Sequence, residues 1–322
     1  MTARPLLARP QPGRHQGVLR EREPDARGGL RAVATVFVTN HECPWRCVMC
    51  DLWRYTTTTA TPPGAITAQL EAALGELAAG PGLPEALKVY NAGSFFDQRA
   101  IPPADLGPIA RLVAPVGHLI VECHPALVGE DVDRFLGARE AARGPNHPPP
   151  TLEVAMGLEC ADDAVLARLE KGMTRADFAA ASAALARRDV AVRAFVLIAP
   201  PFVAPAQRLE TMRAAVRFAL ECGVAVVSLV PTRAGNGALD ELARRGEFRE
   251  PSLAEIEEHA EVALGEAAGH ALVLVDLWDL ERFAPCAACL CARRGRLDSL
   301  NLTQRAPRAV TCERCGAGSA AA

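Results

Sequence analysis

The chain has 322 residues, half of them hydrophobic, and a formal net charge of −3 at pH 7. It can bury a sizeable core, and its near-neutral charge gives no overall signature of nucleic-acid binding. No apolar run reaches the ~18 residues of a membrane span, and eleven cysteines without a secretory signal indicate a reducing cytoplasm and metal ligation rather than disulfides.

Residues 1–30 are rich in Arg, Pro, Gly and Gln and show no hydrophobic periodicity. Such a composition cannot bury enough apolar surface to order itself, so we expect a flexible arm. The next segment, 33–39, is a run of apolar and β-branched residues. This run predicts the first buried strand.

Three cysteines follow this strand at CxxxCxxC spacing, in the segment Cys43-Pro-Trp-Arg-Cys47-Val-Met-Cys50. Three thiolates from one short loop can hold three irons of a [4Fe–4S] cluster and leave the fourth iron open to a ligand. One alternative is a zinc knuckle completed by His41, although His41 lies too close in sequence to close an easy tetrahedron. Another is a disulfide, which would leave an odd thiol. The spacing, with Met49 before the last cysteine, resembles the radical S-adenosylmethionine (SAM) superfamily.

Beyond this loop, short apolar runs alternate with stretches of helical period. The expected strands are 86–91, 117–122, 152–157, 191–198, 224–230 and 271–276. The expected helices are 67–79, 104–114, 130–142, 162–170, 175–188, 206–222 and 253–268. Repeated βα units with buried strands predict an α/β fold with a parallel sheet. Six such units form a partial (βα)6 TIM-like barrel, the arrangement of radical SAM enzymes, in which chemistry lies at the C-terminal strand ends.

The segment at the end of the expected strand 86–91, the second along the chain, is a candidate cofactor site. It contains Asn91, Ala92, Gly93 and Ser94. A glycine here lets the backbone approach a ligand closely, and adjacent peptide groups can hold an ammonium or a carboxylate. Radical SAM enzymes carry a Gly-Gly-Glu segment at this place that binds the SAM amino group. The four residues resemble that segment, without its Glu.

Three charged residues on later strands are further candidates for cofactor binding. Glu122 and Glu159 end two strands, where a carboxylate can accept hydrogen bonds from the SAM ribose or ammonium; helix capping or a surface position are the alternatives. Arg193 lies inside an apolar strand and must be paired or point into a polar cavity. A SAM carboxylate, a substrate phosphate and a buried ion pair all remain open as its partner.

The composition changes after the expected barrel (31–278), and we expect 279–322 to form a small Cys-rich metal-binding module. Its two CxxC pairs are supplied by Cys286, Cys289, Cys312 and Cys315. Two such pairs some twenty residues apart predict a zinc site, or an auxiliary iron–sulfur cluster with Cys291 as a spare ligand. The candidates for phosphate contacts in this module are Arg293, Arg294, Arg296, Arg305, Arg308 and Arg314.

Segments spread over 33–305 resemble the archaeosine-synthase radical SAM subunit family. They include CPWRCVMCDLW, KVYNAGSFFD, VECHP, EVAMGLE, LEKGMT, VRAFVLIAPPF, VPTRAGNG, DLWDLE and NLTQ. Members of that family act on tRNA and cleave a C–N bond of a lysine adduct of a deazaguanine base by a radical route, beside a lysine-transferring partner enzyme. The resemblance implies a cytoplasmic enzyme with a [4Fe–4S] cluster, SAM and an electron donor such as ferredoxin or flavodoxin.

Two other functions remain open. One is a radical SAM enzyme that acts on a small molecule or peptide. The other is a non-enzymatic, zinc-stabilised nucleic-acid-binding protein. The sequence singles out no residue that contacts the reacting atoms of a substrate. It also leaves open the substrate, the tail metal and the oligomeric state.

Overall fold

The computed structural model describes residues 10–25 and 27–316. The strands form one eight-stranded sheet in chain order, from β1 to β8. They are β1 (Gly17–Pro24), β2 (Leu30–Phe37), β3 (Ala86–Tyr90), β4 (His118–Glu122), β5 (Thr151–Glu159), β6 (Ala191–Ile198), β7 (Val226–Pro231) and β8 (Leu272–Val275). Helices connect β2 and the later strands, and the pairs β2–β3, β3–β4, β6–β7 and β7–β8 are parallel. This topology confirms the expected α/β fold of the partial (βα)6 barrel type.

The helices also follow the expected pattern closely. They are α1 (Ala65–Ala79), α2 (Pro103–Leu112), α3 (Glu130–Ala141), α4 (Asp163–Arg168), α5 (Arg175–Ala186), α6 (Arg208–Glu221), α7 (Ala238–Arg244), α8 (Leu253–Ala267) and α9 (Ala287–Thr303). The short α7 and the long α9 were not among the predicted elements. In the part of the chain described, no helix is both long and apolar enough to cross a membrane.

The chain divides into two compact units. The first contains most of β2, together with β3, β4 and α1 to α3, and the second contains β6 to β8 and α4 to α9. The strands β1 and β5 both begin in the first unit and continue in the second. The cysteine loop is divided as well, because Cys43 belongs to the first unit and 45–50 to the second. The loop is nevertheless one continuous stretch of chain.

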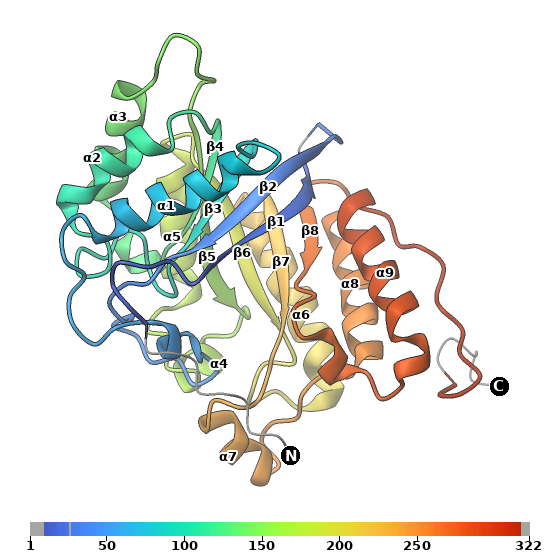
Figure 1. The fold of residues 1–322 in the computed structure, drawn as a ribbon. Coiled ribbons are helices and arrows are strands. Elements are labelled where there is room, and N and C mark those ends of the chain that lie inside the picture. Colours follow the sequence, from blue (N-terminus) through green and yellow to red (C-terminus); the bar gives the residue numbers. More distant parts are fainter. Residues whose placement is uncertain (1–9, 26, 317–322) are drawn as a thin grey trace. The chain divides into compact units, whose positions relative to one another are not determined.

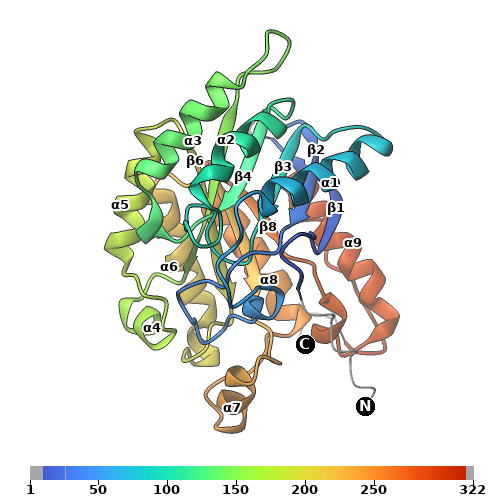
Figure 2. The ribbon, with the colours of Figure 1, turned by 60° about the vertical axis from the view of Figure 1, so that its left-hand side comes forward.

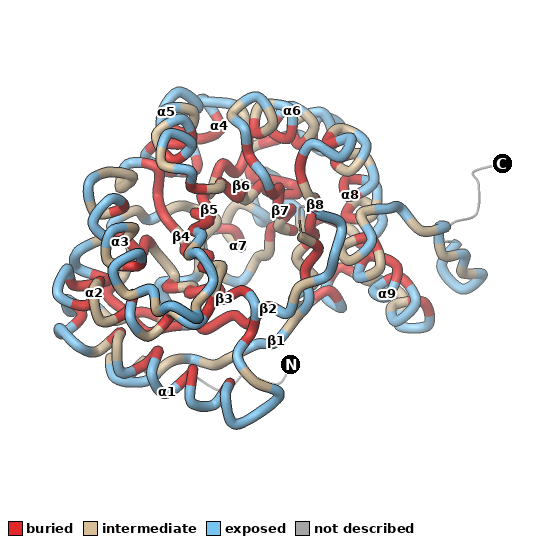
Figure 3. The backbone as a smooth tube through the Cα atoms, turned by 90° about the horizontal axis from the view of Figure 1, so that it is seen from above, coloured by how far each residue is buried: buried red, intermediate tan, exposed pale blue. Residues whose placement is uncertain are grey.

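In the first unit, α1, α2 and α3 follow one another along the strands β2 to β4 (Figures 1 and 2). The strands are buried because their residues are β-branched or aliphatic, as in the register Val36↔Val89. Three aromatic rings close the core beside α3: the centroid of Phe95 lies 5.3 Å from Phe96 and 5.0 Å from Phe135. Figure 3 shows buried residues on the strands and exposed residues on the outer sides of the helices.

In the second unit, α8 and α9 lie side by side next to β8 (Figure 1). The backbone of β8 is completed by two side chains from α9 and its C-cap. Asn301 pairs with the N–H and C=O of Val275, and Gln304 pairs with those of Val273, at 2.7 to 2.9 Å. These amides satisfy backbone groups that an edge strand would otherwise leave exposed. The Cys-rich module is therefore attached to the barrel through α9.

The expected flexible arm is wrong for 17–24, which form β1. Glu21 of this strand pairs with buried Lys88, and Glu23 is itself buried. Because carboxylates occupy these positions, β1 lacks the apolar alternation by which a strand is recognised. The first nine residues of the predicted arm and the last six of the predicted module lie outside the described residues.

Candidate functional site

The cysteine loop lies between β2 and α1, and no disulfide joins Cys43, Cys47 or Cys50. All three thiols are half-buried, as is Met49. The second part of the loop is fixed by hydrogen bonds rather than by a core. The Val48 N–H donates to the Leu169 carbonyl at 2.9 Å, and the Cys50 N–H donates to the Cys47 carbonyl at 3.0 Å.

Two contacts from distant parts of the second unit hold the loop further. The Asn236 side chain donates to the carbonyl of Val48 at 2.8 Å. The indole of Trp45 lies against Gly172, where a β-carbon would come within 2.4 Å of the ring, and Gly172 has a φ of +68°. Only glycine combines this backbone conformation with such a close approach. These contacts fix the course of the loop.

A buried ion pair lies near the thiols of this loop. Lys171 Nζ is 2.6 Å from Oε1 of Glu159, and both side chains are about nine-tenths buried. Burial lowers the pKa of Lys171, but Glu159, Cys47 and Cys50 outweigh it, so the pKa is raised. Burial also raises the pKa of Cys47, and the charge of Lys171 acts in the opposite direction. Lys171 thus favours the thiolate of Cys47, whereas burial and the charge of Glu159 oppose it.

The backbone conformation at Glu159 and the absence of a side chain at Gly157 make room for this ion pair. Glu159 ends β5 with a φ of +66°, a left-handed conformation that few non-glycine residues adopt. A β-carbon on Gly157 would lie 2.2 Å from Glu159 Oε1 and 2.4 Å from Lys171 Nζ. Glu159 is therefore at the expected strand end, engaged by a lysine that the sequence analysis missed. The available signal was that Lys88 and Lys171 are the only lysines in the chain.

In the first unit, the segment Asn91–Ser94 lies beside Cys43. A β-carbon on Gly93 would be 3.5 Å from the Cys43 β-carbon, and Ala92 has a φ of +50°. The Asn91 side chain is completely buried, and neither its nitrogen nor its oxygen has a hydrogen-bond partner. A buried unpaired amide costs about 1–3 kcal/mol, so this side chain is a built-in polar contact for a ligand.

Two hydrogen bonds hold that segment in position. Glu122 Oε2 accepts from the Asn91 N–H at 2.9 Å, and Ser94 Oγ accepts from the His124 N–H at 2.8 Å. The carboxylate of Glu122 thus lies at the expected strand end and orients the segment. The first unit therefore brings a cysteine and a carboxylate next to the segment that carries the unpaired Asn91 amide.

Arg193 has a different role from the cofactor contact considered above. Its guanidinium donates to both oxygens of Glu23, at 3.1 and 2.9 Å, and the two side chains are buried. The sequence left a buried ion pair open as one possibility, and the structure favours it. The guanidinium fork is engaged by β1, which corrects the expectation of a cofactor contact.

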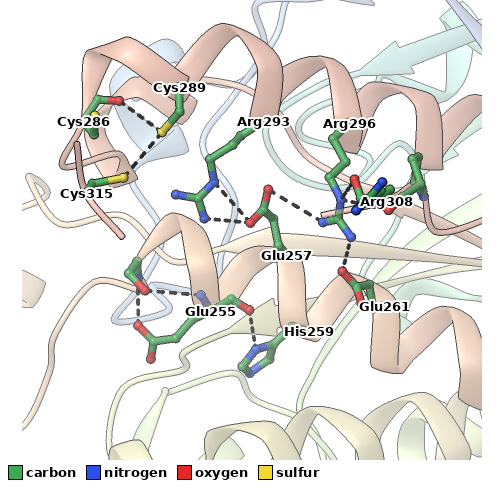
Figure 4. A network of polar contacts seen from close by, with 12 residues as sticks. Glu255, Glu257, His259, Glu261, Cys286, Cys289, Arg293, Arg296, Arg308 and Cys315 are labelled. Carbon is green, nitrogen blue, oxygen red and sulfur yellow. Dashed lines mark hydrogen bonds and ion pairs between the residues drawn. The ribbon is translucent and has the colours of Figure 1, made fainter. Parts of the chain in front are cut away.

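The tail cysteines form a second candidate metal centre. The Sγ atoms of Cys286, Cys289, Cys312 and Cys315 all lie within 4.8 Å of one another. Figure 4 shows three of them at the start of α9, with Cys289 Sγ 3.7 Å from Cys315 Sγ. Backbone N–H groups of Cys315 and Arg314 lower the pKa of Cys312 to about 7, which favours its thiolate. Cys291 is exposed and outside the group.

The spacing of these sulfurs suits a single ion. Four thiolates around one tetrahedral zinc at the usual Zn–S length are about 3.8 Å apart. A cubane distributes its cysteine ligands over four irons and so holds them farther apart. The group could hold one ion with all four positions filled by protein, as in structural sites.

Two arginines of α9 are not available for phosphate. Arg293 donates to Glu257 at 2.6 Å, while Arg296 pairs with Glu261 and donates to the Pro307 carbonyl at 3.0 Å (Figure 4). Both arginine side chains are buried. The expectation of phosphate contacts is therefore wrong for these two residues, because they attach α9 to α8.

The chain is similar in sequence to part of a curated protein. No family model matches the chain. Archaeosine synthase subunit beta of Thermococcus kodakarensis is 29% identical over 131 residues, which are 39% of this chain and 38% of that protein. The match thus spans well under half of the curated relative.

A solved structure shares the fold. Methylornithine synthase (PylB) aligns with a TM-score of 0.51 and 15% identity, over 80% of this chain and 68% of that one. Coproporphyrinogen III oxidase (HemN) from Escherichia coli, described as a radical SAM enzyme, aligns with a TM-score of 0.45 and 13% identity, over 72% and 51%. The chain shares its barrel fold with methylornithine synthase, and a segment of 131 residues is similar in sequence to archaeosine synthase subunit beta.

Proposed function

We propose that this protein is a radical SAM enzyme in which Cys43, Cys47 and Cys50 hold a [4Fe–4S] cluster. The donor set fits, since three half-buried thiols without disulfides stand at this spacing in one shaped loop. Once bound, the cluster would supply the electron that cleaves SAM to methionine and a 5′-deoxyadenosyl radical, which abstracts hydrogen from the substrate. The observation that carries this proposal is the buried, unpaired Asn91 amide beside Cys43.

The residues around the thiols have distinct parts in the proposal. Asn91, with Ala92, Gly93 and Ser94, would hold the polar amino-acid end of SAM, because the amide of Asn91 offers both a donor and an acceptor. Glu122 would orient this segment through the Asn91 N–H. Met49 would contact the cofactor from within the loop. Glu159 would position Lys171, whose ammonium group favours the thiolate of Cys47.

We further propose a substrate carried by tRNA, a deazaguanine whose lysine adduct loses its C–N bond in a lyase reaction. The support is the likeness to archaeosine synthase subunit beta. A lysine-transferring enzyme would supply the adduct, and a ferredoxin or flavodoxin would supply electrons. A cytoplasmic location agrees with eleven cysteines that form no disulfide.

A small-molecule or peptide substrate is the second candidate. The pairing of Arg293 and Arg296 with glutamates favours it, because the tail then presents fewer free cations to RNA than its composition suggests.

The decisive experiment is anaerobic reconstitution with iron and sulfide. We expect about four irons per chain outside the tail site, and 5′-deoxyadenosine from SAM under reducing conditions. Cys47→Ser should lose both, whereas Cys291→Ser, which changes an exposed thiol, should retain both. Full activity of the Cys47 variant would overturn the cluster assignment. Nucleoside analysis of tRNA from a deletion strain then distinguishes the two candidate substrates. Only the tRNA substrate predicts that a modified base is missing from the tRNA of that strain.

A further inference from the structure

A polar pocket in the second unit is lined by none of the residues assigned above. Its volume is about 270 Å³, and its lining includes Arg168, Phe202, Arg208, Glu247 and Arg249. These residues come from the end of α4, the loop after β6, the start of α6 and the loop after α7. We call it the arginine pocket.

The inner part of the arginine pocket has more positive charge than its partners neutralise. Arg208 is 2% exposed; it donates to Glu255 at 3.2 Å and to the Arg249 carbonyl at 2.8 Å, and its Nε is buried without a partner. Arg249 uses the same carboxylate, at 2.9 and 3.0 Å. Burial and the charge of Arg249 lower the pKa of Arg208. Two guanidinium groups thus share one carboxylate.

The outer part of the pocket presents a third guanidinium. Arg168 lies over the Phe202 ring at 3.9 Å and pairs with Glu247 at 3.0 Å. Phe202 has a φ of +70°, a strained conformation for an aromatic residue and one that occurs mostly at functional sites. Arg168 and Arg249 are each more than half exposed. Counting Glu247 and Glu255, three arginines face two carboxylates, which leaves an excess of one positive charge.

We propose that the arginine pocket binds a phosphate ester, supplied by the backbone of a bound RNA. Arginine forks match phosphate oxygens, and an added anion would relieve the repulsion between Arg208 and Arg249. A hydrogen bond also connects the pocket's chain segment to the cysteine loop, because Arg168 precedes Leu169, whose carbonyl accepts from the Val48 N–H. RNA as the source rests on the tRNA substrate proposed above, whereas the phosphate chemistry rests on the pocket alone.

The test uses the full-length chain and a fluorescently labelled tRNA transcript, with anisotropy measured at several salt concentrations. Arg168→Gln and Arg249→Gln remove exposed charges, so both variants should fold. Each should bind several-fold more weakly and flatten the slope of log K against log salt by about one unit. The matched control is Arg217→Gln, an exposed arginine of α6 paired with Glu266, which should bind like the wild type.

Calorimetry with guanosine monophosphate forms the second arm. If the wild type binds this nucleotide but no tRNA, and the Arg168 and Arg249 variants lose the nucleotide, the phosphate site stands and the tRNA substrate is wrong. If neither ligand depends on these arginines, the pocket inference is overturned. SAM cleavage measured without RNA should be unchanged in both variants. A failure of the proposed radical chemistry is thereby distinguished from a failure of the pocket inference.

Discussion

Asn91 combines a structural cost with a proposed binding role, and the two can be separated. Its amide is buried and unpaired, so replacement by an apolar residue of similar size removes a desolvation penalty. Asn91→Leu should therefore leave the unfolding free energy unchanged or raise it by about 1–3 kcal/mol. The same change should weaken SAM binding at least tenfold. Urea unfolding and calorimetry measure the two effects, and a destabilised variant with normal SAM affinity would show that Asn91 is only structural.

The effects of substituting Lys171 and Glu159 on the unfolding free energy should be strongly coupled. Removing one partner leaves the other as an unpaired buried charge, so Lys171→Met should destabilise the protein by about 3–5 kcal/mol. Adding Glu159→Met should restore much of this loss, because neither charge then remains. A double variant as unstable as the sum of the single variants would contradict the coupling.

The space around Gly93 predicts different effects for alanine and for valine at this position. A β-carbon there would contact the Cys43 β-carbon at an ordinary 3.5 Å, so Gly93→Ala should reconstitute its iron normally. The branches of valine would press on Cys43, so Gly93→Val should bind less iron and less SAM. Equal iron content and SAM affinity in the two variants would mean that the segment is a plain turn.

At the scale of elements, β1 illustrates why one strand was missed. The strands β2 to β8 were predicted because their buried residues are mostly aliphatic. In β1, Glu21 and Glu23 face Lys88 and Arg193 instead, and a charged pattern predicts an exposed arm. Helix α9 was missed for a similar reason, since Arg293 and Arg296 are among its buried residues.

The same argument gives a prediction for β1. Glu23→Ala would leave the buried guanidinium of Arg193 without its bidentate partner, which should cost about 3–5 kcal/mol of unfolding free energy. The matched control is Glu130→Ala, which removes an exposed glutamate that pairs with Arg134 on the surface, and it should cost less than 1 kcal/mol. Similar values for the two variants would show that β1 contributes little to the barrel.

At the scale of the whole molecule, sequence spacing identified the thiols but not their surroundings. The two cysteine groups are recognisable because each lies within a short stretch of chain. Lys171, Asn236 and the arginine pocket are assembled by the fold from residues far apart in sequence. Composition also misleads about RNA binding, because Arg193, Arg293 and Arg296 neutralise buried glutamates or fasten helices instead of facing solvent.

The tail metal should stabilise the segment that follows α9 more than α9 itself. Asn301, Gln304, Arg293 and Arg296 attach α9 to its neighbours without any metal, whereas 309–316 contain no helix or strand and depend on Cys312 and Cys315. Chelation or Cys312→Ser should therefore release one zinc per chain and remove hydrogen-exchange protection from 309–316. Protection of 287–303 and the iron–sulfur absorbance should remain. A variant that instead loses half of its iron would show that the tail holds an auxiliary cluster.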